Sequence, residues 1–367
     1  MNDLSELKNY VVAHAKTQRL QGYQQVLDRI RTDGSGPGSW AHEWSAAAKE
    51  WERQGKIRDA CRGFVMARFP FVDGEPRREA QDNAVRAFGE WARTERIEPL
   101  TVDAPGGPLR CWTIGLSRTE RRPLVVIMGG IVSVKEQWGS MLPFLRKQGL
   151  AGIAMELPGI GENTGVYTAE SWKQLPAVLD AVRDRCDVTR TYALMFSFSG
   201  HMALRSAVDD PRIHGIVTGG APVRGFFTDD VWLRKVPQVT LDTLAHLTGH
   251  PVAELPEVLP GWAMSPGDLA ALDIPVACSA SLRDEIIPPS DLRILRENVR
   301  QLWLLEHDDV HAAPAHFVET QLFVMQSLLR MRNVRNLQSL GVGLLLRVAR
   351  ARGRRITAAA AKQTGNP

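Results

Sequence analysis

From residue 123 onward, short apolar runs alternate with segments long enough to form helices. The runs are residues 124–128, 150–155, 192–196, 213–218, 274–279 and 302–306. Continuous apolar runs of this length are typical of strands that are buried on both faces of a sheet. Their alternation with helical segments predicts an α/β fold, in which helices cover both faces of a mostly parallel sheet.

The first 95 residues have a different pattern and read as helical. Trp40, Trp44 and Trp51 recur at spacings of four and seven, which places them on one helical face. After this region, residues 97–102 and 109–114 resemble two short strands joined by a turn rich in proline and glycine. We therefore expect a helical cap domain followed by an antiparallel hairpin that leads into the sheet.

These patterns divide the chain into three parts. Residues 1–95 form the N-terminal helical cap domain, and residues 96–333 form the sheet domain. An insertion at about 221–273 lies within the sheet domain, since this stretch is too long for a simple crossover between two strands. Residues 334–367 form a basic C-terminal tail.

The net charge is unevenly placed along the chain. Its 45 basic and 41 acidic residues give a net charge of +4, but nine of the basic residues follow Glu319, which is the last acidic one. The rest of the chain therefore carries a net charge of −5. A basic tail on a mildly acidic body does not indicate a nucleic-acid-binding protein.

A serine directly after the strand at residues 192–196 is the first candidate for chemistry. A serine on a sharp strand-to-helix turn is a nucleophile elbow, usually within the pattern G-x-S-x-G, because strand and helix approach closely there. Here the pattern reads Met195-Phe196-Ser197-Phe198-Ser199, so Met195 replaces the first glycine. Ser197 is the preferred nucleophile. Ser199 is its rival, although it would place bulky His201 at the second tight position.

An acid and a histidine follow the next two strand ends. Asp284 comes after residues 274–279, and His311 comes after residues 302–306. Glu285 competes with Asp284, and His307 and His316 compete with His311. The order Ser197, Asp284, His311 at successive strand ends is that of an α/β-hydrolase triad. A serine hydroxyl needs an imidazole to remove its proton, and the imidazole needs a carboxylate to fix its tautomer.

A glycine-rich loop follows the first buried strand of the alternating region. Residues 129–136 read GGIVSVKE, and such a loop lets backbone N–H groups face a site. We expect the backbone N–H groups of Ile131 and Phe198 to form an oxyanion hole, with Gly130 in contact with substrate. Neither GxGxxG nor GK[ST] occurs, so a nucleotide site is not expected. No metal or organic cofactor is needed for this chemistry.

These segments resemble the FrsA-like α/β-hydrolases, a family with an N-terminal helical domain. The resemblance covers about residues 35 to 332 and includes residues 129–136, residues 158–162 (PGIGE), the serine elbow, Asp284 and His311. Members include bacterial esterases, the pseudooxynicotine-type C–C hydrolase and the fungal yellowish-green polyketide-shortening hydrolase. The resemblance implies the α/β-hydrolase fold with a Ser-Asp-His triad. It departs at Met195 and at Val132, where an acidic residue is common.

The function expected from these features is a serine hydrolase that works through an acyl-enzyme. The resemblance implies an ester, a thioester or a β-diketone or polyketide-like substrate, cleaved at a C–O, C–S or C–C bond. One alternative keeps the fold but uses Ser197 for acyl transfer or cyclisation. A second alternative, motivated by Met195, is a degenerate hydrolase fold that acts as a binding or regulatory protein.

Substrate contacts and partners are less constrained by the sequence. Trp232 and Phe227 in the insertion are expected to line an aromatic-friendly pocket, although such residues also serve to pack a cap onto a core. The basic tail is interpreted in three ways: as a solvated helix, as a contact for an acidic acyl carrier protein that delivers the substrate, or as a contact for anionic membrane. The sequence leaves the formation of a homodimer undecided.

The compartment is inferred from the remaining features. The sequence has no signal-peptide pattern at its beginning and no apolar run of the roughly 20 residues that a membrane helix requires. Its four cysteines are widely spaced without a CxxC pair, which fits reduced thiols. We therefore expect a cytoplasmic protein.

Overall fold

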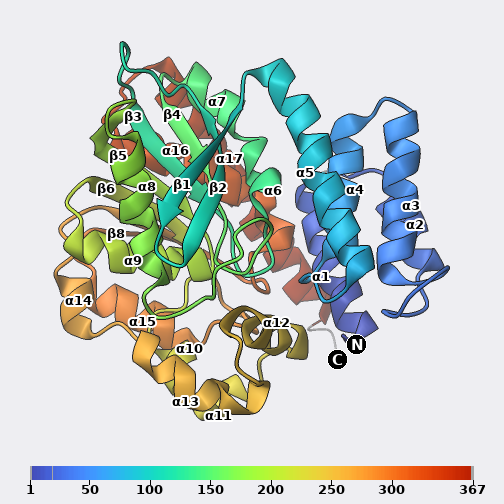
Figure 1. The fold of residues 1–367 in the computed structure, drawn as a ribbon. Coiled ribbons are helices and arrows are strands. Elements are labelled where there is room, and N and C mark those ends of the chain that lie inside the picture. Colours follow the sequence, from blue (N-terminus) through green and yellow to red (C-terminus); the bar gives the residue numbers. More distant parts are fainter. Residues whose placement is uncertain (1, 19, 365–367) are drawn as a thin grey trace.

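A twisted eight-stranded sheet forms the centre of the computed structural model, which describes residues 2–18 and 20–364 (Figure 1). The strand order is β1-β2-β4-β3-β5-β6-β7-β8. The strands are β1 (Glu98–Ala104), β2 (Gly107–Ile114), β3 (Pro123–Met128), β4 (Ala151–Ala154), β5 (Asp187–Met195), β6 (Ile213–Gly219), β7 (Val276–Ser281) and β8 (Leu302–His307). The pairs from β4 to β8 are parallel, whereas β1 pairs with β2 and β2 with β4 in antiparallel fashion. The sheet is thus the mostly parallel α/β sheet that the sequence predicts.

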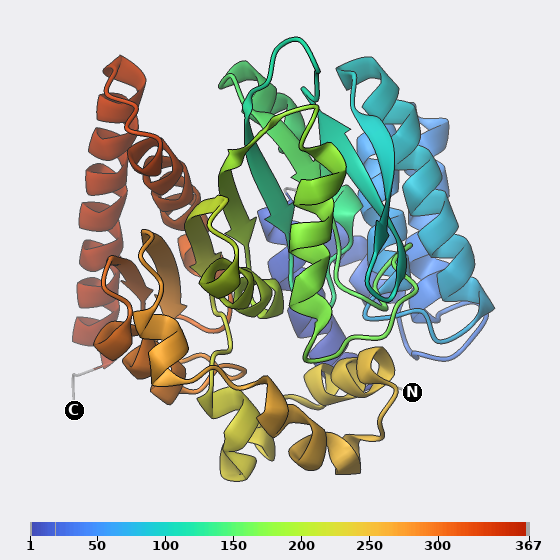
Figure 2. The ribbon, with the colours of Figure 1, turned by 60° about the vertical axis from the view of Figure 1, so that its left-hand side comes forward.

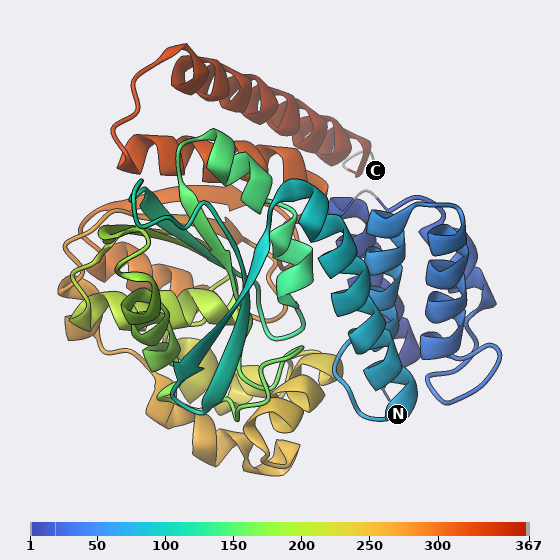
Figure 3. The same ribbon diagram turned by 45° about the horizontal axis from the view of Figure 1, so that its top comes forward.

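Helices cover both faces of this sheet. They are α6 (Lys135–Gly139), α7 (Leu142–Lys147), α8 (Gln174–Val182), α9 (Phe198–Asp209), α15 (Pro289–Asn298) and α16 (Phe317–Met331). Helices α6, α7 and α16 lie on one face, and α8 and α9 lie on the other (Figure 3). Burial on both faces explains why β3 and β4 are apolar throughout, since every side chain on them meets a helix layer.

Five helices before the first strand form a layer beside the sheet (Figures 1 and 3). They are α1 (Leu4–Thr17), α2 (Tyr23–Arg29), α3 (Trp40–Arg53), α4 (Ile57–Arg68) and α5 (Glu75–Glu95). Trp40 and Trp44 are fully buried in a second apolar cluster within this layer. Phe88 of α5 instead joins the main core, where its ring centroid lies 5.0 Å from that of Trp112 in β2. The helical layer is therefore docked on the sheet by apolar packing.

The segment between β6 and β7 forms a second cover over the carboxyl ends of the strands. It consists of α10 (Gly225–Thr228), α11 (Asp230–Leu233), α12 (Gln238–Thr248), α13 (Leu255–Val258) and α14 (Pro266–Ala270). Helix α12 meets α1, because the hydroxyl of Tyr10 lies 3.0 Å from that of Thr240 and Glu6 accepts a hydrogen bond from the backbone of Val239 at 2.8 Å. Two segments far apart in sequence thus close over the same end of the sheet.

The basic C-terminal segment forms a long helix, α17 (Leu337–Thr364), which runs beside α16 at the edge of the molecule (Figure 2). Val342 and Leu346 are buried, while Leu337, Leu340 and Leu344 are exposed. The helix therefore uses one apolar face for packing and leaves a second apolar face uncovered by the described residues. Within residues 2–18 and 20–364, no helix is both long and apolar enough to cross a membrane.

Candidate active site

Ser197 sits on a sharp turn between β5 and α9. Its backbone has φ 56° and ψ −129°, a conformation that L-residues rarely adopt, and its N–H donates to the carbonyl of Gly219 at 2.8 Å. Strain of this kind is characteristic of a nucleophile elbow, because it presents the serine hydroxyl above the end of the sheet. Ser197 lines the large cavity beneath the two covers.

The rival serine has a packing role. The hydroxyl of Ser199 is buried and donates to the backbone carbonyls of Met128 at 3.0 Å and Phe196 at 2.9 Å. Ser199 therefore ties the first turn of α9 to the end of β3, and its hydroxyl is occupied by backbone acceptors. The close approach of helix and sheet falls one residue later, at Gly200, where an added Cβ would lie 2.9 Å from the Cβ of Ala221.

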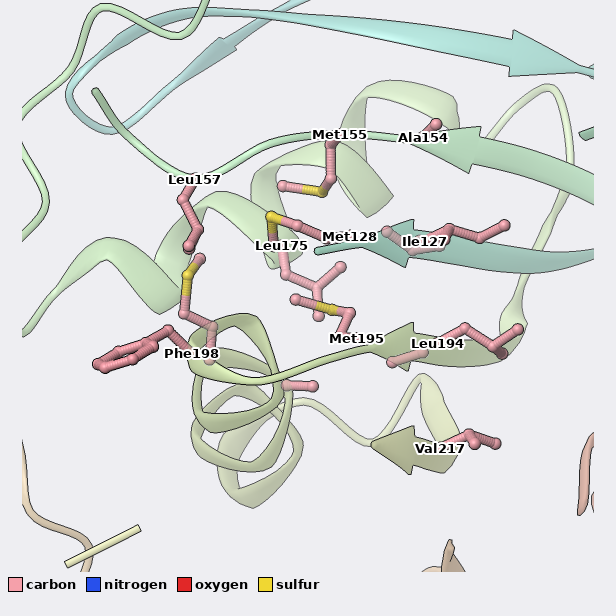
Figure 4. Close-up of a cluster of buried hydrophobic side chains, with 14 of the residues drawn as sticks. Ile127, Met128, Ala154, Met155, Leu157, Leu175, Leu194, Met195, Phe198 and Val217 are labelled. Atoms are coloured by element: carbon pink, nitrogen blue, oxygen red, sulfur yellow. The ribbon is translucent and has the colours of Figure 1, made fainter. Parts of the chain in front are cut away.

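Met195 does not disturb the elbow. Figure 4 shows its side chain in a buried cluster with Met128, Met155 and Leu175, where the flexible thioethers fill the space between strands and helix. Met195 is fully buried at the end of β5, beside Met128 in the register of β3 and β5. The glycine of the usual pattern is thus replaced by a side chain for which the core has room.

The structure brings the three predicted triad side chains together. The Oγ of Ser197 lies 3.2 Å from Nε2 of His311, and Nδ1 of His311 lies 2.9 Å from Oδ2 of Asp284. Asp284 is held in turn by the backbone N–H groups of Ile286 and Ile287, at 2.9 and 2.8 Å. These contacts form one continuous chain from carboxylate through imidazole to hydroxyl.

The competing residues make other contacts. Glu285 accepts the backbone N–H of His311 at 2.9 Å, so it holds the main chain of the loop and leaves the ring to Asp284. His307 hydrogen-bonds Thr320 at 3.1 Å and stacks on His316, with ring centroids 4.5 Å apart.

A glycine makes room for the ring of His311. Gly220 has φ +59°, and a Cβ at this position would lie 2.6 Å from Cε1 of His311. Only glycine satisfies both constraints without strain. Gly220 follows β6, so the carboxyl ends of β5, β6, β7 and β8 all contribute to the same site.

Two opposing effects set the charge state of His311. Burial acts to lower the pKa of His311, but the nearby charge of Asp284 and its hydrogen bond outweigh burial, so the pKa of His311 lies above its usual value. The imidazole is therefore a stronger base than a free histidine, which suits the removal of a proton from Ser197.

The glycine-rich loop after β3 packs against the nucleophile. A Cβ on Gly130 would lie 3.0 Å from the Cβ of Ser197, so loop and serine are in close contact. Phe198 is the first residue of α9, and its N–H belongs to the helix N-terminal groups that lack an intrahelical acceptor. Ile131 and Phe198 both line the cavity, as the predicted oxyanion hole requires.

A buried ion cluster fixes this loop. The ammonium of Lys135 contacts carboxylates of Glu136 at 2.9 Å, Glu156 at 3.1 Å and Glu162 at 2.8 Å. Burial raises the pKa of Glu156 to about 7, although the charge of Lys135 opposes this effect. Glu156 also accepts the backbone N–H of Lys135 at 2.9 Å and that of Glu162 at 2.8 Å, so it joins the glycine-rich loop to the PGIGE loop after β4.

The covers enclose a cavity of about 1050 Å³ above Ser197 and His311. Tyr10 and His14 of α1 and Thr240 of α12 contribute to its lining. Burial, followed by the proximity of His311 and Arg68, lowers the pKa of His14 to about 4, so this imidazole is neutral at pH 7. No motif in the sequence marks these residues as part of the site.

Phe227 and Trp232 do not belong to the described lining of the cavity. Phe227 is buried, with its ring centroid 4.8 Å from that of His201. The indole of Trp232 donates to the carbonyl of Ile286 at 2.8 Å. Phe227 is thus packed in the core, whereas Trp232 is only partly buried against it, and neither lines the described cavity. Their contacts with substrate stay a prediction.

One group in the described part of the chain has the composition of a metal site. Ligand atoms of His307, His316 and Glu319 all lie within 4.8 Å of one another. Arg350 contacts the same Glu319 at 3.5 Å, which already balances its charge. The group does not include Ser197, Asp284 or His311.

The parallel sheet, the elbow and the converging side chains define an α/β-hydrolase. The family model described as "Esterase FrsA-like" matches residues 6–260. The chain therefore belongs to the FrsA-like esterase family. Esterase FrsA of Vibrio vulnificus strain YJ016 is 24% identical over 296 residues, which cover 76% of this chain and 68% of that protein.

Solved structures extend the likeness over nearly the whole chain. The structure titled "AbyA5 Wildtype" is 47% identical, with a TM-score of 0.91, and the match covers 94% of this chain and 99% of that one. The 2,6-dihydroxy-pseudo-oxynicotine hydrolase is 19% identical, with a TM-score of 0.68 over 85% of this chain and 94% of that one. The second likeness shows the shared fold.

Proposed function

We propose that this protein is a serine hydrolase that cleaves a carboxylic ester, a thioester or a β-diketone-type substrate through an acyl-enzyme. The observation that carries the proposal is the contact chain from Asp284 through His311 to Ser197, with separations of 2.9 and 3.2 Å. All three substrate types present a carbonyl carbon that a serine can attack, so one site geometry serves each of them.

In the proposed mechanism, His311 accepts the Ser197 proton at Nε2 while Oγ forms a bond to the carbonyl carbon. The N–H groups of Ile131 and Phe198 stabilise the developing oxyanion. The bond to the leaving group then breaks, and His311 returns the proton to that group, which leaves an ester on Ser197. Water, activated by His311, cleaves this ester and releases the acid. Asp284 keeps the imidazole in the required tautomer throughout.

A fluorophosphonate probe tests the nucleophile. The wild-type protein should become labelled, Ser197→Ala should not, and Ser199→Ala should still be labelled, because its hydroxyl only bonds backbone carbonyls. Labelling of Ser197→Ala would contradict the assignment of Ser197 as the nucleophile. Absence of labelling of the wild type would contradict the proposal and favour a binding protein.

Hydrolysis in heavy-oxygen water separates the remaining reaction types. An acyl-enzyme resolved by water places solvent oxygen in the released acid. Acyl transfer or cyclisation gives a product without it. Intact mass spectrometry after an acid quench should also show the acyl group on the wild-type protein and none on Ser197→Ala.

A further inference from the structure

The cavity continues well beyond the triad. Its volume of about 1050 Å³ lies above the usual range for a site that holds a small ligand. Away from Ser197 its walls are mostly apolar, and they come from α4, α5, α7 and α16. Figure 3 shows α6 and α7 between α16 and α4.

Helix α4 provides the first wall. Arg58, Cys61, Arg62 and Val65 line the cavity, and their spacing of three and four residues places them on one helical face. At the other end of the helix, Arg68 donates to the carbonyl of Val132, next to the proposed oxyanion hole, at 2.7 Å. Ten residues of helix therefore carry the wall about 15 Å away from the glycine-rich loop.

Helix α16 provides the second wall. Phe317, Gln321, Met325 and Leu328 line the cavity, again on one helical face. The helix begins six residues after His311 and ends at Met331, whose sulfur lies against Gly215 near the start of β6. From Phe317 to Leu328 this wall is about 16 Å long.

The lengths of the α4 and α16 walls indicate how long a bound ligand can be. An extended chain advances about 1.2 Å per bond, so 15 Å corresponds to about twelve bonds. Side chains such as Phe144, Leu194 and Leu322 also border the cavity and offer apolar contacts rather than hydrogen bonds. A ligand that fills this space therefore has a reactive carbonyl at one end and a long apolar chain behind it.

We propose that the cavity is a chain-binding channel and that the substrate carries an apolar chain of about ten to twelve carbons, whose length is measured by α4 and α16. This inference rests on the proposed function for the position of the carbonyl. The channel itself depends only on the cavity walls, so it can be tested without catalysis.

Binding to the Ser197→Ala protein provides this test. Calorimetry with linear methyl ketones of about five to fifteen carbons should show Kd falling about fourfold for each added methylene. The decrease should stop near twelve carbons, where the channel ends. A Kd that is independent of chain length would overturn the proposal.

A tryptophan inside the channel provides the variant test. Met325→Trp should weaken binding of the twelve-carbon ketone relative to the five-carbon one by at least about tenfold, because the indole blocks the far part of the channel. Arg330→Trp is the matched control on the same helix, since Arg330 is exposed and does not line the cavity. Equal effects of the two substitutions would count against a channel along α16.

Ester turnover separates this proposal from the proposed function. Two series of esters are compared: p-nitrophenyl esters with acyl chains of increasing length, and acetates with alkyl chains of increasing length. In at least one of the two series, kcat/KM should increase with chain length. Turnover without chain-length dependence in either series would leave the hydrolase and remove the channel. Chain-dependent ketone binding without fluorophosphonate labelling would leave the channel and remove the serine hydrolase.

Discussion

The carboxylate of Glu285 accepts the backbone N–H of His311 at 2.9 Å, although the two residues are 26 positions apart. Its neighbour Asp284 contacts the ring of the same histidine, so consecutive acids hold the main chain and the side chain of one residue. The loop after β8 is thereby fixed to the loop after β7, and the position of His311 depends on both.

Removal of the main-chain contact should loosen the histidine. It should also lower the pKa of His311, because the charge of Glu285 helps to raise that pKa. We expect Glu285→Ala to lower kcat about tenfold, because a small displacement of the base is costly. Glu285→Gln should recover much of this activity, since its amide oxygen still accepts the N–H. Steady-state kinetics of both variants provide the measurement, and equal losses would argue against a role for the hydrogen bond.

The pH profile should report the charge state of His311. The imidazole acts as a base only when neutral, so kcat/KM should increase with pH. Because Asp284 raises the pKa of His311 despite burial, the midpoint should lie above the ordinary value of 6.5.

Asp284→Asn removes the charge that raises this pKa. The midpoint of its pH profile should therefore move to lower pH. Its kcat should fall by about 10⁴-fold, because asparagine no longer holds the imidazole of His311 in the tautomer that accepts the serine proton. A midpoint that does not move in this variant would show that another group controls the titration.

Gly220 offers a test of close packing at the site. Gly220→Ala and Gly249→Ala both place alanine at a positive φ, +59° and +72°, and both should lose about 1 kcal/mol of stability. Only the first also meets the ring of His311, since nothing lies within 4 Å of a Cβ at Gly249. Activity should therefore be lost in Gly220→Ala alone, when both are assayed well below their melting temperatures.

The buried ammonium of Lys135 should contribute more to the free energy of unfolding than an exposed ion pair does. Lys135→Met leaves carboxylates of Glu136 and Glu156 buried without their cation, which we expect to cost about 3–5 kcal/mol. Arg110→Met removes an exposed partner of Glu162 and should cost at most about 1 kcal/mol. Chemical denaturation of both variants gives the comparison, and similar losses would contradict the importance of burial.

The sheet and the convergence of Ser197, Asp284 and His311 could be predicted because their signals are local. Apolar runs mark buried strands, and Ser197, Asp284 and His311 each follow one directly. The lining contributed by Tyr10 and His14 could not be predicted, since it depends on how α1 docks against α12. No periodicity within α1 reports that contact.

The aromatic residues of the insertion illustrate the same limit. The composition of this segment suggested a pocket lined by Phe227 and Trp232, but neither residue lines the described cavity. Which face of a four-residue helix is buried depends on its neighbours, because such a helix has too few turns to show an amphipathic pattern.

Met195 has a consequence for recognising enzymes of this kind. A pattern search that demands glycine two positions ahead of the nucleophile would not retrieve this chain, even though its backbone bends at Ser197 as such a pattern implies. A methionine-rich pocket accommodates the larger side chain ahead of the serine, and the close approach of helix and sheet after the serine falls at Gly200. Hydrolases with a bulky residue ahead of the serine are better identified by the backbone conformation of the turn than by its sequence pattern.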